Sequence, residues 1–178
     1  MLAETRYGQI RGGHNGFSLP MGASETFYSK SGRFVKNDVS GRGELALAGS
    51  STLQGFVRDG QPDDGAGGGG LGTGGTEGDK KFWCIIDLSA VFRLPLAYTA
   101  SYTANYDDNM IGEHCDLVVI SGVQYVDVTN SAKDVVRVVG GKAATAVFVP
   151  AGITGLTQGD GYVDVMLIES KLYAQGVA

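Results

Sequence analysis

Five apolar runs follow one another near the C-terminus: Cys115-Asp-Leu-Val-Val-Ile-Ser121, Val123-Gln-Tyr-Val-Asp-Val-Thr129, Val135-Val-Arg-Val-Val139, Thr145-Ala-Val-Phe-Val149 and Tyr162-Val-Asp-Val-Met-Leu-Ile-Glu169. Turn-forming glycine, asparagine and serine residues separate them. In the last run Val163, Val165 and Leu167 share one face of a strand, and Asp164 lies on the other. Short links favour antiparallel pairing, because a parallel crossover needs a dozen residues or more. The sequence therefore predicts an all-β protein, an antiparallel barrel or sandwich.

Shorter β-favouring runs lie earlier in the chain, at residues 25–29, 33–36, 44–48, 53–58, 81–88 and 96–103. In the third of these, alternation predicts that Leu45 and Leu47 share a face. Two single helical turns are alternatives to strand, one over residues 89–94 that Pro95 would end, and one beginning at Ser131. Residues 105–109 predict a turn.

The composition agrees with a turn-rich β protein. Of 178 residues, 29 are glycine and 4 are proline, and no Gly-X-Y period exists, which excludes collagen. Glycine at this level also argues against a helical bundle. With 43% apolar and 19% charged residues, general disorder is excluded as well. No run approaches the length of a membrane span, and the first residues lack an apolar signal core, so we expect a soluble protein made in a cytoplasm.

The glycines divide the chain into an extended N-terminal arm at residues 1–24 and a single β domain at residues 25–178. A flexible loop at residues 60–78, in which ten of nineteen residues are glycine, interrupts the domain. The arm carries large apolar residues, which we interpret as anchors on another surface. The alternative is an arm that lies across the protein's own core.

Charge is unevenly distributed along the chain. The net charge is −5, with +2 in residues 1–60 and −7 in the remainder. Nucleic acid is disfavoured as a partner, because phosphate binding needs a clustered basic face. A basic N-terminal segment suits docking onto an acidic protein surface, and a random distribution of surface charge is the alternative.

No pattern of residues predicts catalysis or metal binding. The chain has two histidines, His14 and His114, and neither HExxH nor paired CxxC is present. Residues 113–116 are rich in ligand types, but consecutive strand residues point to opposite faces, so we interpret His114 as an edge histidine. Asp107, Asp108 and Asn109 with Glu113 do not have the spacing of a calcium loop, and a polar turn is favoured.

Two further features also have structural interpretations. Residues 70–75 match GxGxxG formally, but glycine-rich coil precedes them and a strand follows, so no dinucleotide site is predicted. Cys84 and Cys115 are predicted to be buried thiols, and a disulfide formed in an oxidising compartment is the alternative. We therefore expect no catalytic residue, cofactor or metal, and no enzyme activity.

A resemblance to a known family covers residues 32–57 and 111–172. It runs from Gly32-Arg-Phe-Val-Lys36 to Leu53-Gln-Gly-Phe-Val57, and from Cys115-Asp-Leu-Val-Val119 through Val135-Val-Arg-Val-Val139 to Val163-Asp-Val-Met-Leu-Ile168. In the order and character of these runs the chain resembles the capsid decoration (cement) proteins of tailed bacteriophages. The resemblance implies a β-barrel or β-tulip-like body, oligomers that are often trimers, and an arm that reaches over neighbouring capsid subunits. The glycine tract at residues 60–78 is not part of that pattern.

The expected function is that of a virion protein on the capsid exterior, synthesised in the host cytoplasm. Its expected partners are the major capsid protein and further copies of itself, with no nucleic acid and no membrane. It would stabilise the assembled shell by binding assembled subunits and not dissociated ones. Deletion of residues 1–24 is expected to abolish binding and leave a folded body. The candidate partner-binding residues lie in the arm: Arg6, Tyr7, Ile10, Arg11, Phe17, Leu19 and Met21.

Three alternatives stay open. The first is another virion component, such as a tail-tube, head-completion or fibre protein. The second is a carbohydrate-binding β-sandwich that uses Trp83, Tyr98, Tyr102 and Tyr106 as stacking faces, although Trp83 is more readily placed in a core. The third is an enzyme of a type that the sequence does not reveal.

Overall fold

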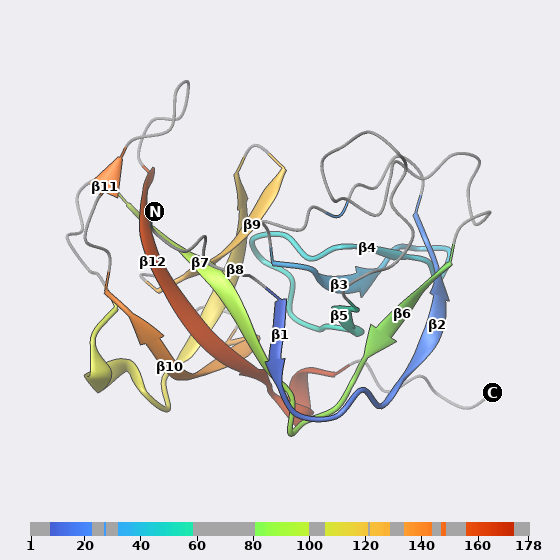
Figure 1. Cartoon of the computed structure of the whole chain (residues 1–178). Coiled ribbons are helices and arrows are strands. Elements are labelled where there is room, and N and C mark those ends of the chain that lie inside the picture. Colours follow the sequence, from blue (N-terminus) through green and yellow to red (C-terminus); the bar gives the residue numbers. More distant parts are fainter. Residues whose placement is uncertain are drawn as a thin grey trace, which may run out of the picture.

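The regular structure is almost entirely β (Figure 1). The computed structural model describes residues 8–22, 27, 32–58, 81–99, 106–120, 122–128, 134–143, 147–148 and 156–172. Within these ranges the prediction of an all-β fold is confirmed, and the only helical elements are single 3₁₀ turns at Asp108–Met110 and Glu169–Lys171. The predicted loop at residues 60–78 and most of the predicted strand at residues 25–29 lie outside the described residues.

The described residues form a first sheet of seven strands, in the order β1-β7-β9-β8-β10-β12-β11. A further pairing of β7 with β12 closes five of them, β7, β9, β8, β10 and β12, into a small ring. Among the described residues, β8–β10 and β7–β9 are each paired at two positions, fewer than the other neighbours in the ring. The strands are β1 (Gly8–Arg11), β7 (Val91–Thr99), β8 (His114–Ile120), β9 (Val123–Asp127), β10 (Val136–Lys142), β11 (Val147–Phe148) and β12 (Leu156–Leu167).

The second sheet is antiparallel, and in the part of the chain that the structure describes it has five strands in the order β2-β6-β5-β3-β4. Its two outer strands also approach each other, because Met21 bridges Gly43 and the Gly22 N–H donates to Gly43 O at 2.9 Å. This sheet is therefore a second, nearly closed ring. Its strands are β2 (Gly16–Pro20), β3 (Phe34–Asn37), β4 (Gly43–Leu45), β5 (Gly55–Val57) and β6 (Lys81–Ile85).

A continuous apolar core joins the two sheets. Phe34 and Phe56 of the second sheet contact Phe92 of β7, with ring centroids 5.3 and 4.4 Å from it. All three rings are fully buried. A separate apolar cluster, which includes Leu19, Met21, Phe82 and Cys84, fills the second ring. The sheets therefore share one core and form a single packed body.

Gln124 of β9 connects the two sheets by hydrogen bonds inside this core. It is completely buried. Its side chain accepts from Phe34 N at 2.8 Å and donates to Phe34 O at 3.0 Å and to Ala46 O at 2.8 Å. Its backbone carbonyl accepts from Gly32 N at 2.9 Å. A single polar residue of the first sheet thus satisfies backbone groups of β3 and of the residue that follows β4 in the second sheet.

The structure confirms several sequence predictions and corrects others. In β12, Val163, Val165 and Leu167 are buried on one face as predicted. Leu47 does not share the buried face of Leu45, because β4 ends at Leu45 and Leu47 is 48% exposed in the following turn. Residues 91–94 are strand and not a helical turn.

Two departures have clear physical reasons. β7 continues through Pro95, where its register with β12 shifts between Gln158 and Tyr162, and such an irregularity tolerates a residue without an N–H. The pair β7–β9 is parallel, although antiparallel pairing was predicted throughout. Residues 100–122, which include β8, separate these two strands and are long enough for a parallel connection.

A corner rich in glycine joins the two sheets. β1 and β2 run beside β7 and β6 respectively, and Figure 1 shows the two strand pairs as the arms of a V that meet at this corner. Gly12 has φ +96°, and a β-carbon there would overlap Ala90 Cα and lie 2.6 Å from Ser89 O. Only glycine allows this approach.

We expect Gly12→Ala to destabilise the fold by about 3 kcal/mol or more, because it combines an unfavourable backbone angle with overlap against another backbone. Gly41→Ala is the matched control, since Gly41 has φ +76° but no atom within 4 Å of the added carbon. That control should lose only about 1–2 kcal/mol. Urea unfolding of the two variants measures the difference, and equal losses would show that crowding at the corner is unimportant.

Candidate functional site

The first candidate site is β1, which lies at the edge of the first sheet. Among the described strands it pairs only with β7, through Gly8–Arg93, Gln9–Phe92 and Arg11–Val91. The register shifts between Gln9 and Arg11, and Ile10 is 44% exposed within this bulge. Arg11 is also exposed. β1 thus presents an apolar and a cationic side chain beside a strand edge.

Gln9 holds the bulge in place. Its Nε2 donates to Gly13 O at 2.5 Å and to Gly12 O at 3.2 Å. A short edge strand with a bulge and a charged residue resists indiscriminate pairing with other strands. A partner of β1 therefore has to match it specifically.

The structure separates the predicted partner-binding residues into three groups. Ile10 and Arg11 are exposed on β1. Phe17 is partly buried, and Leu19 and Met21, each 3% exposed, lie in the core of the second sheet. Arg6 and Tyr7 lie outside the described residues.

These positions correct the predicted boundary at residue 24. Residues 8–20 form β1 and β2 and belong to the body, which corresponds to the alternative of an N-terminal segment across the protein's own core. The expectation that deletion of residues 1–24 leaves a folded body does not fit this arrangement, because the deletion removes one strand from each sheet.

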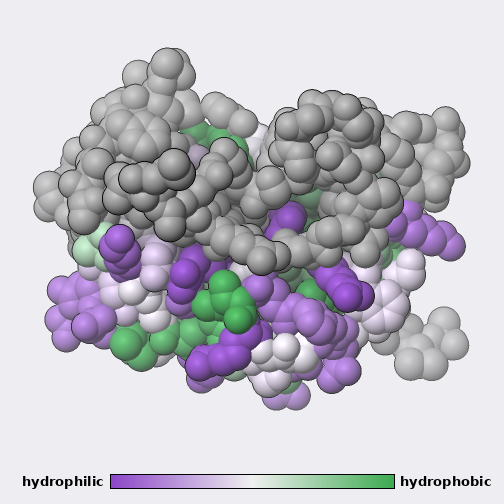
Figure 2. All heavy atoms as spheres, viewed as in Figure 1, coloured by the Kyte–Doolittle hydropathy of each residue, from purple (hydrophilic) through white to green (hydrophobic). Residues whose placement is uncertain are grey.

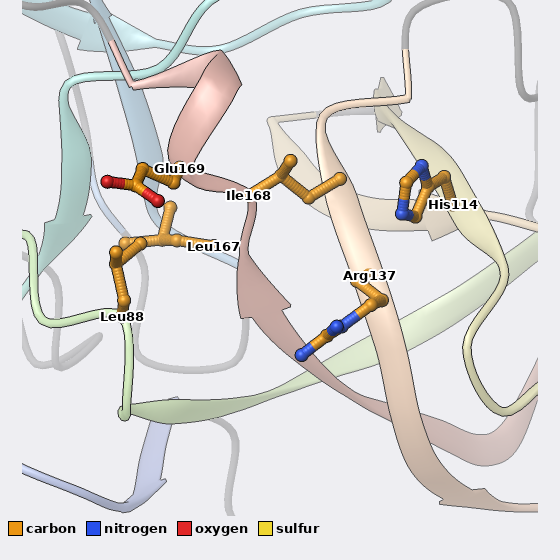
Figure 3. A pocket seen from close by; sticks show the side chains of 6 residues that line it. All are labelled: Leu88, His114, Arg137, Leu167, Ile168 and Glu169. Carbon is orange, nitrogen blue, oxygen red and sulfur yellow. The ribbon is translucent and has the colours of Figure 1, made fainter.

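A second candidate site is a hollow of about 260 Å³ at the end of the first ring (Figure 3). It lies between β10 and the segment that follows β12, with the turn between β6 and β7 at its rim. Its lining combines apolar and ionisable side chains: Leu88, His114, Arg137, Leu167, Ile168 and Glu169. The sequence does not predict that these residues form one site, because they come from separate segments.

A neighbouring hollow of about 420 Å³ shares His114 with the first. The other described residues that line it are Gly112, Glu113 and Asp134, of which two are acidic. Asp134 has φ 54° and donates its N–H to Asp116 Oδ1 at 2.8 Å. Within the part of the chain that the structure describes, no group of three histidine, cysteine or acidic residues is arranged to hold a metal ion.

The predicted polar turn at residues 107–109 is present. Asp107 caps the 3₁₀ turn by accepting from Asn109 N at 2.8 Å. Tyr106 lies beside it, and its hydroxyl donates to Asp108 Oδ1 at 2.9 Å. Burial, followed by this hydrogen bond, raises the pKa of Tyr106 to about 12. The phenol is therefore a structural hydrogen-bond donor at neutral pH.

Two of the aromatic residues of the carbohydrate-binding alternative, Trp83 and Tyr106, have structural contacts within the protein. The Trp83 ring packs against the core, and its Nε1 donates to His14 O at 3.0 Å. Tyr106 is 9% exposed. The side chain of Tyr98, and Tyr102 as a whole, lie outside what the structure describes. The two described rings therefore do not form an open stacking face.

Cys84 and Cys115 are free and buried, as the sequence predicted, and they belong to different apolar clusters. Burial raises the pKa of each thiol to about 12. For Cys115, the nearby carboxylates of Glu113 and Asp127 add to the effect of burial. Since the thiolate is the reactive form, both side chains are inert at neutral pH.

We expect neither thiol to react with 5,5′-dithiobis(2-nitrobenzoate) at pH 8 until the protein unfolds, when both should react. The folded chain keeps protons that the unfolded chain releases above pH 9, so this contribution to stability is present below pH 9. It is lost as the pH rises from 9 towards about 12. Rapid reaction of either thiol in the native protein would contradict the burial of both.

Gln124 has a structural role, the connection of the two sheets by hydrogen bonds, that the sequence analysis does not predict. It lies between Val123 and Tyr125 in a run that was interpreted only as a strand. The one signal that could have found it is an amide between apolar neighbours in a predicted strand, since a buried amide needs internal partners.

Comparison with protein-family models, with curated proteins and with solved structures finds no significant match. Among the described residues, no helix is long and apolar enough to cross a membrane.

Proposed function

We propose that this chain is a structural protein of a tailed-phage virion, which binds the outside of the assembled head and stabilises it by bridging neighbouring capsid subunits. The resemblance of its sequence to capsid decoration proteins motivates the proposal. The observation that carries it is β1, an edge strand with Ile10 and Arg11 exposed, in the segment that was predicted to contact a partner.

An edge strand can be extended by a strand of another protein, whose main-chain hydrogen bonds supply affinity. On the face viewed in Figure 2, small apolar groups stand among hydrophilic ones. This suits attachment through a strand edge and a few side chains. Many weak contacts become strong together when copies are repeated over a shell, and binding to the assembled form alone stabilises that form by mass action.

Cosedimentation with heads tests the proposal. The chain is mixed with purified heads of the phage that encodes it, or with dissociated capsid subunits. We expect binding to heads only, and heads that carry the protein should resist heat or dilution for longer. Failure of the wild-type chain to bind heads, or electron microscopy that places it on a tail or fibre, would refute the proposal in favour of another virion role.

The same assay tests the role of β1. The double variant Ile10→Asp/Arg11→Glu should bind heads at least about tenfold more weakly, because it replaces both exposed contacts by negative charge. Ile111→Asp/Lys142→Glu makes the same charge changes at two exposed positions outside β1 and should bind normally. Equal binding of heads by the two variants would show that β1 does not contact the head. Sedimentation velocity of the free protein tests the expected trimer.

A further inference from the structure

A surface other than β1 has the chemistry of a docking pocket, and it surrounds Arg137. Arg137 and His114 are cross-strand neighbours on β10 and β8. Figure 3 shows their side chains on the two sides of the β10 ribbon, with Ile168 projecting towards β10 from the segment after β12. The hollow of about 260 Å³ described above lies among these residues.

Arg137 has no partner of opposite charge within the described residues. It is exposed, and the one side-chain hydrogen bond that it makes to a described residue is a long one of 3.9 Å, from Nη2 to Met166 Sδ. Glu169 also lines the hollow, but Figure 3 shows its carboxylate on the far side of Ile168, pointing away from Arg137. Since this contact to sulfur is long, the guanidinium can turn its N–H donors to a planar carboxylate.

Three of the described lining residues are apolar, and His114 and Glu169 are polar. Leu88 is 36% exposed at the rim, Leu167 is buried, and Ile168 is partly buried. A volume of about 260 Å³ is below the range of about 300–1,000 Å³ that is usual for small-molecule sites. It has room for one or two side chains of a polypeptide. Leu88, Leu167 and Ile168 beside the Arg137 cation suit a carboxylate with apolar neighbours.

The surrounding carboxylates limit what can bind. Glu113 and Asp134 line the hollow on the other side of His114, and Glu169 lies at the rim. A run of acidic residues would meet these carboxylates and be repelled. A single carboxylate that pairs with Arg137 would lie in the same hollow as His114, whose imidazole can donate an N–H.

We propose that this hollow receives one aspartate or glutamate side chain, flanked by apolar residues, from an extended segment of a partner protein. The carboxylate pairs with Arg137, and its apolar neighbours pack against Leu88 and Ile168. The inference concerns a different surface from β1 and does not depend on whether the partner is a capsid.

Side-chain NMR of the ¹⁵N-labelled full-length chain tests it. The probe is the blocked peptide Ser-Leu-Asp-Leu-Ser, compared with Ser-Leu-Asn-Leu-Ser. The aspartate peptide should shift the Arg137 Nε–H and His114 ring signals saturably, with a Kd in the range of about 1 mM, and the asparagine peptide should bind at least about tenfold more weakly. A peptide with three consecutive aspartates should bind no more tightly than the peptide with one aspartate.

Two charge-neutralising variants on the same strand separate this site from general attraction. Arg137→Gln should weaken binding of the aspartate peptide about tenfold, whereas Lys142→Gln, at the other end of β10, should leave it unchanged. Equal effects of the two variants, equal binding of the aspartate and asparagine peptides, or shifts confined to other residues would each overturn the proposal. Tighter binding of the triple-aspartate peptide would overturn the preference for an isolated carboxylate.

Discussion

Replacing Gln124 by leucine should lower the free energy of unfolding by about 2–6 kcal/mol. The leucine fits the volume but leaves Phe34 N–H and Ala46 O in the core without the partner that the amide supplies. Each buried, unpaired backbone group costs about 1–3 kcal/mol. Phe34 O is less affected, because it also accepts from Ala46 N at 2.9 Å. A loss of this size is a large part of the total stability of a domain.

Urea unfolding followed by circular dichroism measures the loss, and Gln54→Leu is the matched control. Gln54 is also buried, at 2% exposed, but its Nε2 has no hydrogen-bond partner among the described residues. Replacement of Gln54 removes an unsatisfied donor, so the free energy of unfolding of this variant should stay within about 1 kcal/mol of that of the wild type. If the two variants lose the same stability, the cost comes from repacking and not from the hydrogen bonds between the sheets.

The strands were predictable where alternation is strong and local. In β12, Val163, Val165 and Leu167 alternate with less buried residues, and the structure buries all three. The closure of the first ring was not predictable, because it depends on the pairing of β7 with β12 across a long sequence separation. Leu47 was misplaced since nothing local marks the end of β4 at Leu45.

Glycine misled the interpretation of residues 1–24 for a physical reason. The sequence alone does not distinguish a glycine that interrupts a strand from a glycine that allows two backbone segments to approach closely. Gly12 and Gly16 are of the second kind, because a β-carbon at either would overlap backbone atoms of β7's preceding turn or of β6. The apolar residues between them and Gly22 were interpreted as anchors for a partner, yet Leu19 and Met21 fill the protein's own second ring.

The two candidate sites differ in how far the sequence could reveal them. Ile10 and Arg11 were proposed from their place in an apolar and basic segment, and they do reach the surface. The hollow around Arg137 depends on the turn that carries Leu88 and on the residues after β12, and these meet only in the folded chain. No spacing in the sequence relates them.

Deleting residues 1–24 should unfold the second sheet instead of leaving an intact body. The deletion removes β2, which pairs with β6 from Gly16–Ile85 to Pro20–Lys81. It also removes Leu19 and Met21 from the core of that sheet, and the burial of two such side chains contributes about 3–6 kcal/mol. Together with the lost strand pairing, this approaches the whole stability of a typical domain.

A shorter deletion separates stability from binding. Removing residues 1–7 leaves β1, β2 and their pairing with β7 and β6 in place, so the thermal midpoint should stay within a few degrees of the wild type. The variant that lacks residues 1–24 should lose its cooperative transition and expose Cys84 to thiol reagents at pH 8. The deletion removes the strand that pairs with β6, and it removes Leu19 and Met21 from the apolar cluster that contains Cys84. A cooperative transition with a protected Cys84 after the longer deletion would mean that β2 is dispensable. Loss of head binding could then again be assigned to a detachable arm.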